Sequence, residues 1–525
     1  MKKLAFLLCV LPHILAAQAL DPAKLLQPPT NTWPTYNGDY SGRRFSTLKQ
    51  INGGNIQSLS LAWMYRVNVS SLRGISSVQI KSTPLEVDGV LYFTVPDHVW
   101  AVDARTGRML WHYEWKDEGG HLIGNRGVGM YGNWLYFMGP DGWLISLNAA
   151  DGKERWRMHI ADAKLQYFTT MAPLVIHNHI IVGVSGDAMD VPGFLEARDP
   201  ETGALQWRWN TEPQAGQPGA DTWPNAAAME HGGGMTWLPG TYDPELNLLY
   251  WGTGNPNPVF AGQSRNGANL WTCSIVALNP DTGKLVWYFQ ASPHDTHDWD
   301  DVETPVLFDG VINGQRRKLL AQAARNGFFF VLDRTNGKNV VSVPFVGADW
   351  AEGVDAKGQP IPNPKKAPQP DGTLLNISEQ GGTNWFPPSF DPETGMFYVN
   401  AEKGFSVFYL IDQSNNPEGY GGSGQTLWWQ SVLEAIDYRT GKICWSHAFP
   451  GTGRAESGVL STAGDLLFSG DQHGNLIGWN PKSGDILWHF HMPASVSNGP
   501  MTFELDGKQY LVAGAGDTLY AFSVR

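Results

Sequence analysis

Short runs of apolar residues, rather than long helical stripes, dominate the chain. Residues 90–94 (VLYFT), 248–251 (LLYW) and 466–469 (LLFS) are runs of aliphatic and aromatic residues. Such runs, bounded by turn-forming residues, are typical of β-strands. Few segments show the 3.6-residue spacing of an amphipathic helix. The pattern therefore predicts an all-β protein built from short strands.

An eleven-residue unit recurs along the chain. In residues 101–111 it reads AVDARTGRMLW. An Asp side chain can bond the backbone two residues on and Gly readily adopts positive φ, so the unit predicts a tight turn between two strands. Two weaker copies lack the Trp. Together the copies place turn glycines at positions 107, 152, 203, 283, 337, 395, 441 and 484.

Successive turns are 43 to 80 residues apart, which fits one four-stranded blade per turn. Eight turns predict an eight-bladed β-propeller with tryptophan docking motifs. A closed ring also fits the lack of a Ser/Gly linker, so residues 20–525 are expected to form one domain. Residues 510–524 alternate well and are expected to complete a blade with an early strand. The alternative is two stacked sandwiches that share one turn type.

The first 19 residues have the features of an export signal. Lys2 and Lys3 precede a mostly apolar run, and residues 17–19 (AQA) form a small-x-small cleavage site. We expect cleavage after residue 19 and a periplasmic location. No later stretch contains 18 consecutive apolar residues, so no membrane span is expected.

Cysteine content and net charge argue against several classes of protein. Beyond residue 19 only Cys273 and Cys444 remain, which argues against a disulfide scaffold, although one bridge between them stays open. The chain has no C-x-x-C-H motif and therefore no covalently attached c-type haem. Its net charge of −13 argues against nucleic acid as a partner.

The tryptophan-bearing repeat resembles the docking motif of the quinoprotein alcohol dehydrogenases. The resemblance runs from about Trp33 to the C-terminus, and residues 33–46 (WPTYNGDYSGRRFS) are similar to the family's opening segment. Members of this family are periplasmic eight-bladed propellers that use pyrroloquinoline quinone (PQQ) and a metal ion. The resemblance therefore implies PQQ, together with Ca²⁺ or a lanthanide ion, as cofactors.

Two segments resemble the family's metal-binding and catalytic residues. Residues 251–256 (WGTGNP) present the amide of Asn255, a hard neutral ligand suited to Ca²⁺ or a lanthanide. In residues 292–301 (SPHDTHDWDD), Asp298 aligns with the catalytic aspartate, which is also a metal ligand. Asp300 corresponds to the extra carboxylate that marks lanthanide use in this family, and added charge suits a trivalent ion.

Simpler explanations of these two segments stay open. Gly-Asn-Pro is ordinary turn chemistry, so residues 251–256 could be a plain loop. The acidic stretch could be a solvated loop at a blade end. His294 and His297 suggest a zinc site, although no third ligand is apparent.

PQQ is a planar tricarboxylate, so aromatic faces, arginines, hydroxyls and backbone N–H groups are its expected complement. Trp237 matches the family's stacking Trp, and Arg325 matches the arginine that contacts the quinone oxygens, where a guanidinium can stabilise developing charge. A docking role for Trp237 and a surface role for Arg126 are the alternatives. The resemblance assigns cofactor contacts to Arg126, Thr170, Ser185, Gly186, Trp237, Arg325 and Asn384.

The chain departs from the family pattern at His297, where a Trp is usual, and at three further places. Ala188 stands where the family has a metal-binding Glu, so Asp187 is the expected substitute ligand and Asp190 the second choice. The family's adjacent-cysteine disulfide is absent, because Gly120 and His121 stand there. Lys81 replaces a common acidic neighbour of the cofactor, and a lysine beside a tricarboxylate is electrostatically favourable.

The resemblance implies an alcohol dehydrogenase in which Asp298 takes the hydroxyl proton and the carbinol hydride passes to PQQ. Its expected partners are a small alcohol and an external electron acceptor such as a cytochrome c. Two alternatives stay open. One is a non-catalytic scaffold propeller of the outer-membrane assembly type, and the other is a quinoprotein that acts on sugars or polymeric alcohols.

Overall fold

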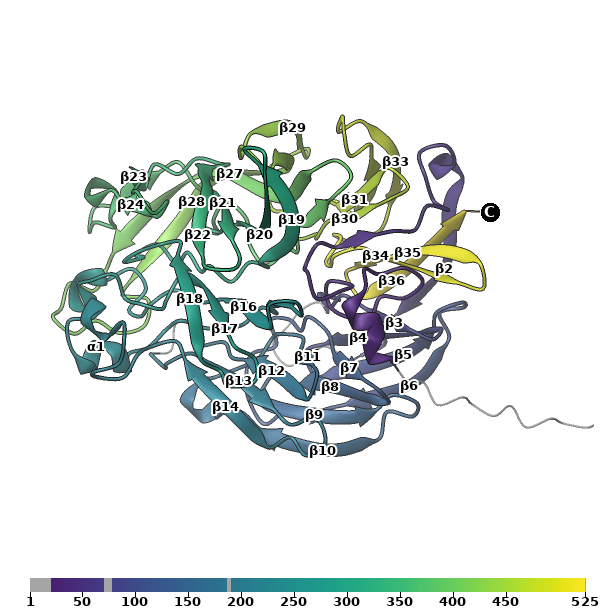
Figure 1. The fold of residues 1–525 in the computed structure, drawn as a ribbon, viewed down its shortest axis with the longest axis horizontal. Coiled ribbons are helices and arrows are strands. Elements are labelled where there is room, and N and C mark those ends of the chain that lie inside the picture. The colour runs from purple at the N-terminus through teal and green to yellow at the C-terminus, as the bar shows by residue number, and fades with distance from the viewer. Residues whose placement is uncertain (1–19, 70–77, 187–189, 525) are drawn as a thin grey trace, which may run out of the picture.

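Strands form nearly all of the regular structure, and small antiparallel sheets are arranged around a ring (Figure 1). The computed structural model describes residues 20–69, 78–186 and 190–524. Within these residues, eight sheets have four or five strands, a number equal to the number of repeated turns. The all-β propeller is thereby confirmed.

The first four sheets follow the chain without interruption, each with its strands in sequence order. They are β3 (Leu85–Val87), β4 (Val90–Val95), β5 (His98–Asp103) and β6 (Met109–Glu114); β7 (Gly129–Tyr131), β8 (Trp134–Met138), β9 (Trp143–Asn148) and β10 (Glu154–His159); β11 (Leu174–Ile176), β12 (His179–Gly183), β13 (Phe194–Arg198) and β14 (Leu205–Asn210); and β15 (Thr241–Asp243), β16 (Leu248–Gly252), β17 (Ser274–Leu278) and β18 (Leu285–Gln290).

The next three sheets include two with a fifth strand, and a two-stranded ribbon interrupts them. They are β19 (Val306–Ile312), β20 (Gln315–Ala323), β21 (Phe328–Asp333) and β22 (Lys338–Pro344); the ribbon β23 (Ala351–Val354) and β24 (Pro360–Pro362); β25 (Thr373–Leu375), β26 (Ser389–Asp391), β27 (Met396–Leu410), β28 (Gly422–Asp437) and β29 (Ile443–Ala448); and β1 (Phe45–Ser46), β30 (Leu460–Thr462), β31 (Leu466–Gly470), β32 (Asn475–Trp479) and β33 (Ile486–His491).

Helices are short and lie in the connections between strands. Those described are η1 (Pro22–Leu26), η2 (Ile56–Ser58), η3 (Ala163–Leu165), η4 (Ala220–Thr222), α1 (Ala226–Glu230), η5 (Gly262–Arg265) and η6 (Pro364–Lys366).

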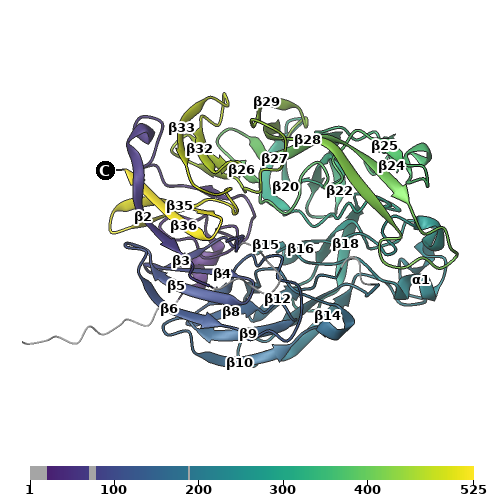
Figure 2. The same ribbon diagram turned by 180° about the vertical axis from the view of Figure 1, so that it is seen from behind.

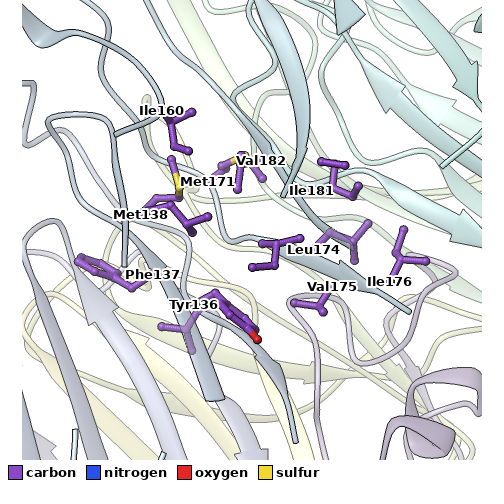
Figure 3. Close-up of a cluster of buried hydrophobic side chains, with 14 of the residues drawn as sticks. Tyr136, Phe137, Met138, Ile160, Met171, Leu174, Val175, Ile176, Ile181 and Val182 are labelled. Carbon is purple, nitrogen blue, oxygen red and sulfur yellow. The ribbon is translucent and has the colours of Figure 1, made fainter. Parts of the chain in front are cut away.

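The hydrophobic core lies between neighbouring sheets. Strand β4 is buried at every position, whereas the outer strand β6 alternates between exposed and half-buried residues. Figure 3 shows side chains of β8, such as Tyr136 and Met138, in one cluster with Leu174 of β11 and Val182 of β12. Inner strands covered on both faces read as continuous apolar runs, and these are the runs visible in the sequence.

The repeated Trp residues pack on the following sheet, in most cases on its glycine turn; the exception is Trp488, whose indole reaches the start of β2 at Leu59. In the first turn, Gly107 has φ +70° and its N–H donates to the Asp103 carbonyl oxygen. A side chain on Gly107 would strike the Trp63 ring at 2.6 Å, and Trp63 Nε1 donates to the carbonyl of Ala104. The same indole-to-carbonyl hydrogen bond is made by Trp111, Trp207, Trp287, Trp445 and Trp488.

Substituting Gly283 by Ala is expected to destabilise the ring. Gly283 has φ +66°, and an added Cβ would lie 2.6 Å from the Trp207 ring. The left-handed backbone costs about 1–2 kcal/mol for a non-Gly residue, and overpacking adds about 1–3 kcal/mol. Gly314→Ala is the matched control, because Gly314 has φ +75° with nothing within 4 Å of the added Cβ. Urea unfolding should show a clearly larger loss for Gly283→Ala; equal losses would contradict the packing argument.

The ring is closed by strands from the two ends of the chain. Strand β2 (Leu59–Arg66) pairs antiparallel with β36 (Thr518–Val524) in a sheet that also contains β34 (Met501–Leu505) and β35 (Lys508–Ala515). Figure 2 shows β2 beside β35 and β36. The expected pairing of the C-terminal segment with an early strand is therefore confirmed.

The turn at Gly395 does not mark a sheet of its own, although the repeat predicts one. It joins β26 to β27, inside the same sheet as the Gly441 turn, which joins β28 to β29. The eighth sheet is the closing one, and its docking Trp is Trp63 on β2. Local turn chemistry is the same in both settings, because the Gly395 N–H also donates to the carbonyl of an Asp four residues earlier.

Two further predictions from composition can be compared with the structure. Cys273 is buried and Cys444 exposed, and both are free, so the bridge left open above is not formed. No helix within the described ranges is long and apolar enough to cross a membrane. Residues 1–19, expected to be an export signal, lie outside the described residues.

Candidate active site

Segments from seven of the sheets, counted over the described residues, line one cavity of about 470 Å³. Most of its polar lining residues come just before the first strand of a sheet. Arg126 precedes β7, Trp237 precedes β15 and Asp298 precedes β19. Equivalent connections lie at the same end of each sheet, so the ring gathers residues that are far apart in sequence. Thr170, Ser185, Asp300, Arg325 and Asn384 also line this cavity.

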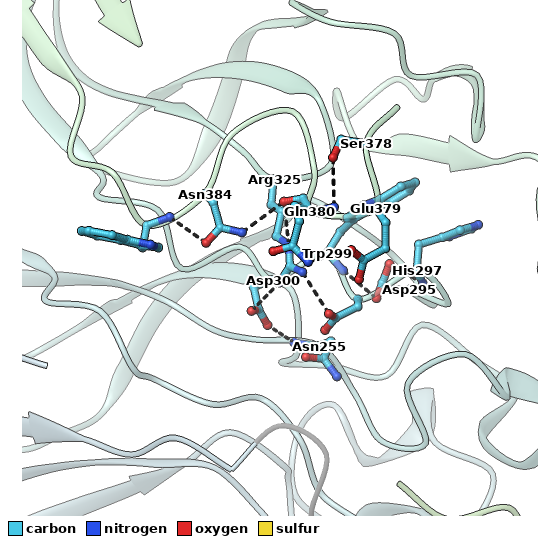
Figure 4. A network of polar contacts seen from close by, with 12 residues as sticks. Asn255, Asp295, His297, Trp299, Asp300, Arg325, Ser378, Glu379, Gln380 and Asn384 are labelled. Atoms are coloured by element: carbon cyan, nitrogen blue, oxygen red, sulfur yellow. Dashed lines mark hydrogen bonds and ion pairs between the residues drawn. The ribbon is translucent and has the colours of Figure 1, made fainter. Parts of the chain in front are cut away.

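An arginine flanked by two carboxylates forms the polar centre of the cavity (Figure 4). Arg325 Nη2 donates to Asp298 Oδ2 at 2.9 Å, and Nη1 donates to Asp300 Oδ2 at 3.0 Å. Asp300 also accepts a hydrogen bond from the Asn255 backbone N–H at 2.8 Å and one from Trp237 Nε1 at 3.2 Å. The three segments that the sequence singled out, around residues 255, 298 and 325, therefore meet at one point.

The loop that carries Asp298 is held in an unusual conformation. Asp298 has φ +65°, a region that non-Gly residues rarely occupy and that is often found at functional sites. Asp295, which is buried, accepts hydrogen bonds from the N–H groups of His297 and Trp299, both at 3.2 Å. The His297 ring stacks on Trp299 with centroids 4.4 Å apart, and its Nε2 lies 3.0 Å from the Lys366 carbonyl oxygen. These contacts fix the loop on both sides of Asp298.

Burial and neighbouring charges shift the pKa values of Asp300 and Arg325 in opposite directions. Burial raises the pKa of Asp300, and the Arg325 guanidinium opposes that rise. Although burial alone would lower the pKa of Arg325, Asp298 and Asp300 raise it above its ordinary value. Behind them, burial raises the pKa of Glu303 to about 8. Arg325 is therefore the permanent cation that keeps two buried carboxylates together.

Aromatic and cationic side chains form the other part of the cavity. The Arg126 guanidinium carbon lies 5.0 Å from the Trp237 ring centroid and 5.2 Å from that of Trp385. Thr170 Oγ1 and Ser185 Oγ are 3.4 Å apart. Asn384 Oδ1 accepts from the Trp385 N–H at 2.9 Å. Gly186, with φ +149°, follows Ser185 and is not among the described residues that line the cavity.

The donor set fits a hard cation. Asn255 Oδ1 is buried and receives no hydrogen bond from any residue that the structure describes. Beside it, the Asn255 N–H holds Asp300 Oδ1. An amide oxygen and carboxylates are ligands that Ca²⁺ and lanthanide ions prefer, and an orphaned buried oxygen is what such an ion would satisfy.

Asp187 and Asp190 are the two carboxylates that were expected to replace the missing metal-binding Glu. Asp187 lies outside the described residues. Asp190 Oδ2 accepts from the Gly419 N–H at 2.7 Å, and its Oδ1 lies 3.4 Å from His231 Nδ1, so both carboxylate oxygens contact groups other than Asn255.

The zinc alternative is not supported. His294 Nδ1 lies 2.9 Å from the carbonyl oxygen of Gly267, and the His297 ring bonds a different carbonyl, that of Lys366. In the described part of the chain, no group of three or more His, Cys, Asp or Glu residues is arranged to hold a metal ion.

Comparison with known proteins places this site in a family. The glucose/ethanol/alcohol dehydrogenase β-propeller domain matches residues 33–373. The chain is 36% identical to quinoprotein alcohol dehydrogenase PedH of Pseudomonas putida, over 95% of this chain and 89% of that protein. It belongs to the PQQ-dependent quinoprotein alcohol dehydrogenases. The chain is therefore an oxidoreductase that acts on alcohols, as the resemblance implied.

Solved structures agree with this quinoprotein assignment. The quinohemoprotein alcohol dehydrogenase from Comamonas testosteroni superposes with a TM-score of 0.88 at 32% identity, covering 97% of this chain and 83% of that chain. A europium-containing methanol dehydrogenase superposes with a TM-score of 0.85 at 28% identity, covering 95% and 99%. Residues 430–525 also match the outer membrane protein assembly factor BamB family, which reflects the shared repeat and covers only the last part of this quinoprotein.

Several residues that line the quinoprotein cavity were not expected from the sequence. Trp385 follows Asn384 directly, so its place in the same segment was a usable signal. Asp295 fixes the Asp298 loop without lining the cavity, and no sequence signal marked it, because a buried carboxylate looks like any other acid in residues 292–301. The further lining residues include Ile123, Phe168, Phe260, Glu379, Gln380, Tyr420, Arg454 and Glu456.

Proposed function

We propose that this quinoprotein oxidises a small alcohol with Asp298 as the general base. The Arg325 pairing with Asp298 and Asp300 at the centre of the cavity is the observation that supports this role most directly. The proposed cofactor contacts are Arg126, Thr170, Ser185, Gly186, Trp237, Arg325 and Asn384, and the proposed metal ligands are Asn255, Asp187, Asp298 and Asp300.

When bound, PQQ would supply a quinone that accepts a hydride, and the metal ion would supply Lewis acidity. The chain supplies position and charge. Asp298, paired with the Arg325 guanidinium, would accept the hydroxyl proton of the alcohol. Trp237 offers a flat face for a planar ring, while Arg126 and the hydroxyls of Thr170 and Ser185 suit carboxylates.

Apolar walls support a small alcohol rather than a sugar. Phe260 and Tyr420 both line the cavity and stack with ring centroids 5.9 Å apart. Ile123 and Phe168 add further apolar surface to its lining. Such walls suit an alkyl or aryl tail, whereas a sugar would leave its hydroxyls unpaired against them.

Electrons would leave through a separate protein. The chain lacks a C-x-x-C-H motif for covalent haem, whereas the Comamonas relative is by name a quinohemoprotein. A cytochrome c is the proposed acceptor. The N-terminal signal, residues 1–19, supports a periplasmic location in which such an acceptor would meet the enzyme.

Reconstitution tests the proposed function. Metal-free protein is mixed with PQQ and either La³⁺ or Ca²⁺, and a panel of alcohols, sugars and polyols is assayed with an artificial electron acceptor. We expect PQQ to co-purify with the protein through dialysis only when a metal is present, and turnover to be confined to small alcohols. Absence of bound PQQ under all conditions would contradict the proposal, and preference for a sugar would contradict the substrate assignment.

A further inference from the structure

Three cationic side chains from three different sheets gather on one aromatic surface of the cavity. Lys81 precedes β3, Arg126 precedes β7 and Arg454 precedes β30. Lys81 Nζ lies 5.7 Å from the centroid of the Trp385 ring, over which Arg126 also lies. Arg454 lies over the adjacent Phe386 ring, 5.0 Å from its centroid. The cations are thus neighbours, although they are far apart in the sequence.

Two of these cations have acidic partners, one loose and one close. Lys81 Nζ is 3.8 Å from Glu456 Oε2, a loose ion pair. Arg454 Nε is 3.0 Å from Glu402 Oε1, and Arg454 Nη1 donates to Gln380 Oε1 at 2.7 Å. Burial lowers the pKa of Lys81, and the nearby Arg126 and Arg454 lower it further while Glu456 opposes the shift. Positive charge is therefore concentrated on this side of the cavity.

The cavity is lined by groups of both charges. Asp298 and Asp300 share Arg325, whereas Lys81 and Arg454 pair with Glu456 and Glu402. Lys81 and Arg454 are mostly buried, with side-chain exposures of 20% and 15%. Holding like charges together out of water costs free energy unless an anion joins them. The cluster of cations therefore suits a ligand that carries carboxylates.

We propose that Lys81 and Arg454 bind the carboxylates of PQQ together with Arg126, and that Glu456 tunes this clamp by offsetting part of its charge. This inference rests on the proposed function. It extends that function to Arg454 and Glu456, which the resemblance did not single out, and it gives Lys81, expected beside the cofactor, a direct contact. Guanidinium and ammonium groups pair strongly with carboxylates, and partial burial strengthens such pairs.

Binding of PQQ, rather than turnover, tests the clamp. Metal-loaded protein is titrated with PQQ by equilibrium dialysis, for the wild type and for Lys81→Gln, Arg454→Gln and Glu456→Gln. Loss of a charge-assisted contact should raise the Kd about 10- to 100-fold for each of the first two variants. Glu456→Gln should lower the Kd, because it removes a repulsive carboxylate. Lys482→Gln, whose lysine is exposed and paired with Asp465, is the matched control and should leave the Kd unchanged.

Further measurements separate the possible outcomes. Arg454→Lys should retain most of the affinity, and the salt dependence of Kd should weaken in Lys81→Gln and Arg454→Gln. Unchanged Kd values in these two variants, with a wild type that binds PQQ, would overturn the clamp and leave the proposed function intact. A changed KM for hydroxy acids without a changed PQQ Kd would also overturn it, since the cations would then serve an anionic substrate. A wild type that binds no PQQ would overturn the proposed function itself.

Discussion

Replacing Asp298 by Asn is expected to lower kcat about 10²- to 10⁴-fold while the fold is retained. An amide can accept a hydrogen bond and ligate a metal, but it cannot take a proton at neutral pH. The substituted side chain keeps nearly the same shape, so the left-handed backbone at this position and the stacking of His297 on Trp299 should persist. Steady-state kinetics with a small alcohol would measure the loss.

Two controls make this result specific to the base. Asp412→Asn changes a half-buried aspartate after β27 that does not line the cavity, and it should leave kcat unchanged. Bound PQQ should be measured in Asp298→Asn, because loss of a metal ligand would also lower activity. Near-normal kcat with bound cofactor would remove Asp298 from the mechanism.

A light lanthanide is expected to support turnover at least about tenfold better than Ca²⁺. Asp298 and Asp300, which lie together at Arg325, would place two carboxylates beside the ion if they bind it as proposed, and a trivalent cation would balance that charge better than Ca²⁺. One additional unit of charge at 4 Å contributes about 4 kcal/mol at an effective dielectric constant of 20, of which ion dehydration offsets a large part. Stronger Lewis acidity would also favour the chemistry.

The decisive comparison uses Asp300→Asn beside the wild type, each reconstituted with La³⁺ or Ca²⁺ and PQQ. The preference for La³⁺ should shrink in Asp300→Asn, because one carboxylate is lost while the hydrogen-bonding shape is nearly kept. Higher activity with Ca²⁺ than with La³⁺ in the wild type would contradict the prediction. If Asp300→Asn prefers La³⁺ as strongly as the wild type does, the lanthanide preference stands but Asp300 is not its cause.

The sequence predicted the architecture well wherever one turn marks one sheet. The turn at Gly283 is such a case, because the Asn, Gly and Trp of its unit all lie within eleven residues. The turn at Gly395 was wrongly assigned to a sheet of its own. The hydrogen bond from its N–H to the Asp391 carbonyl is local and does not show which strands the turn joins. The closing sheet has no such turn, because its outer strand β2 comes from the opposite end of the chain.

The candidate site was predictable only where a short motif carried it. Asn255, Asp298 and Arg325 each lie in a distinctive segment, and the structure brings the three segments together. Arg454 and Glu456 lie outside any motif and reach the cavity because β30 starts beside it. Their role depends on distances to Lys81 and Phe386, which no spacing in the sequence encodes.

Closure of the ring by β2 and β36 has a consequence for the order in which the protein matures. A ribosome releases the N-terminal strand β2 long before its partner β36, so β2 must wait for the last residues of the chain. The cavity likewise draws Lys81 from an early segment and Arg454 from a late one. Cofactor capture should therefore follow completion of the whole polypeptide, and a nascent chain that lacks its final strand should be unable to retain the cofactor.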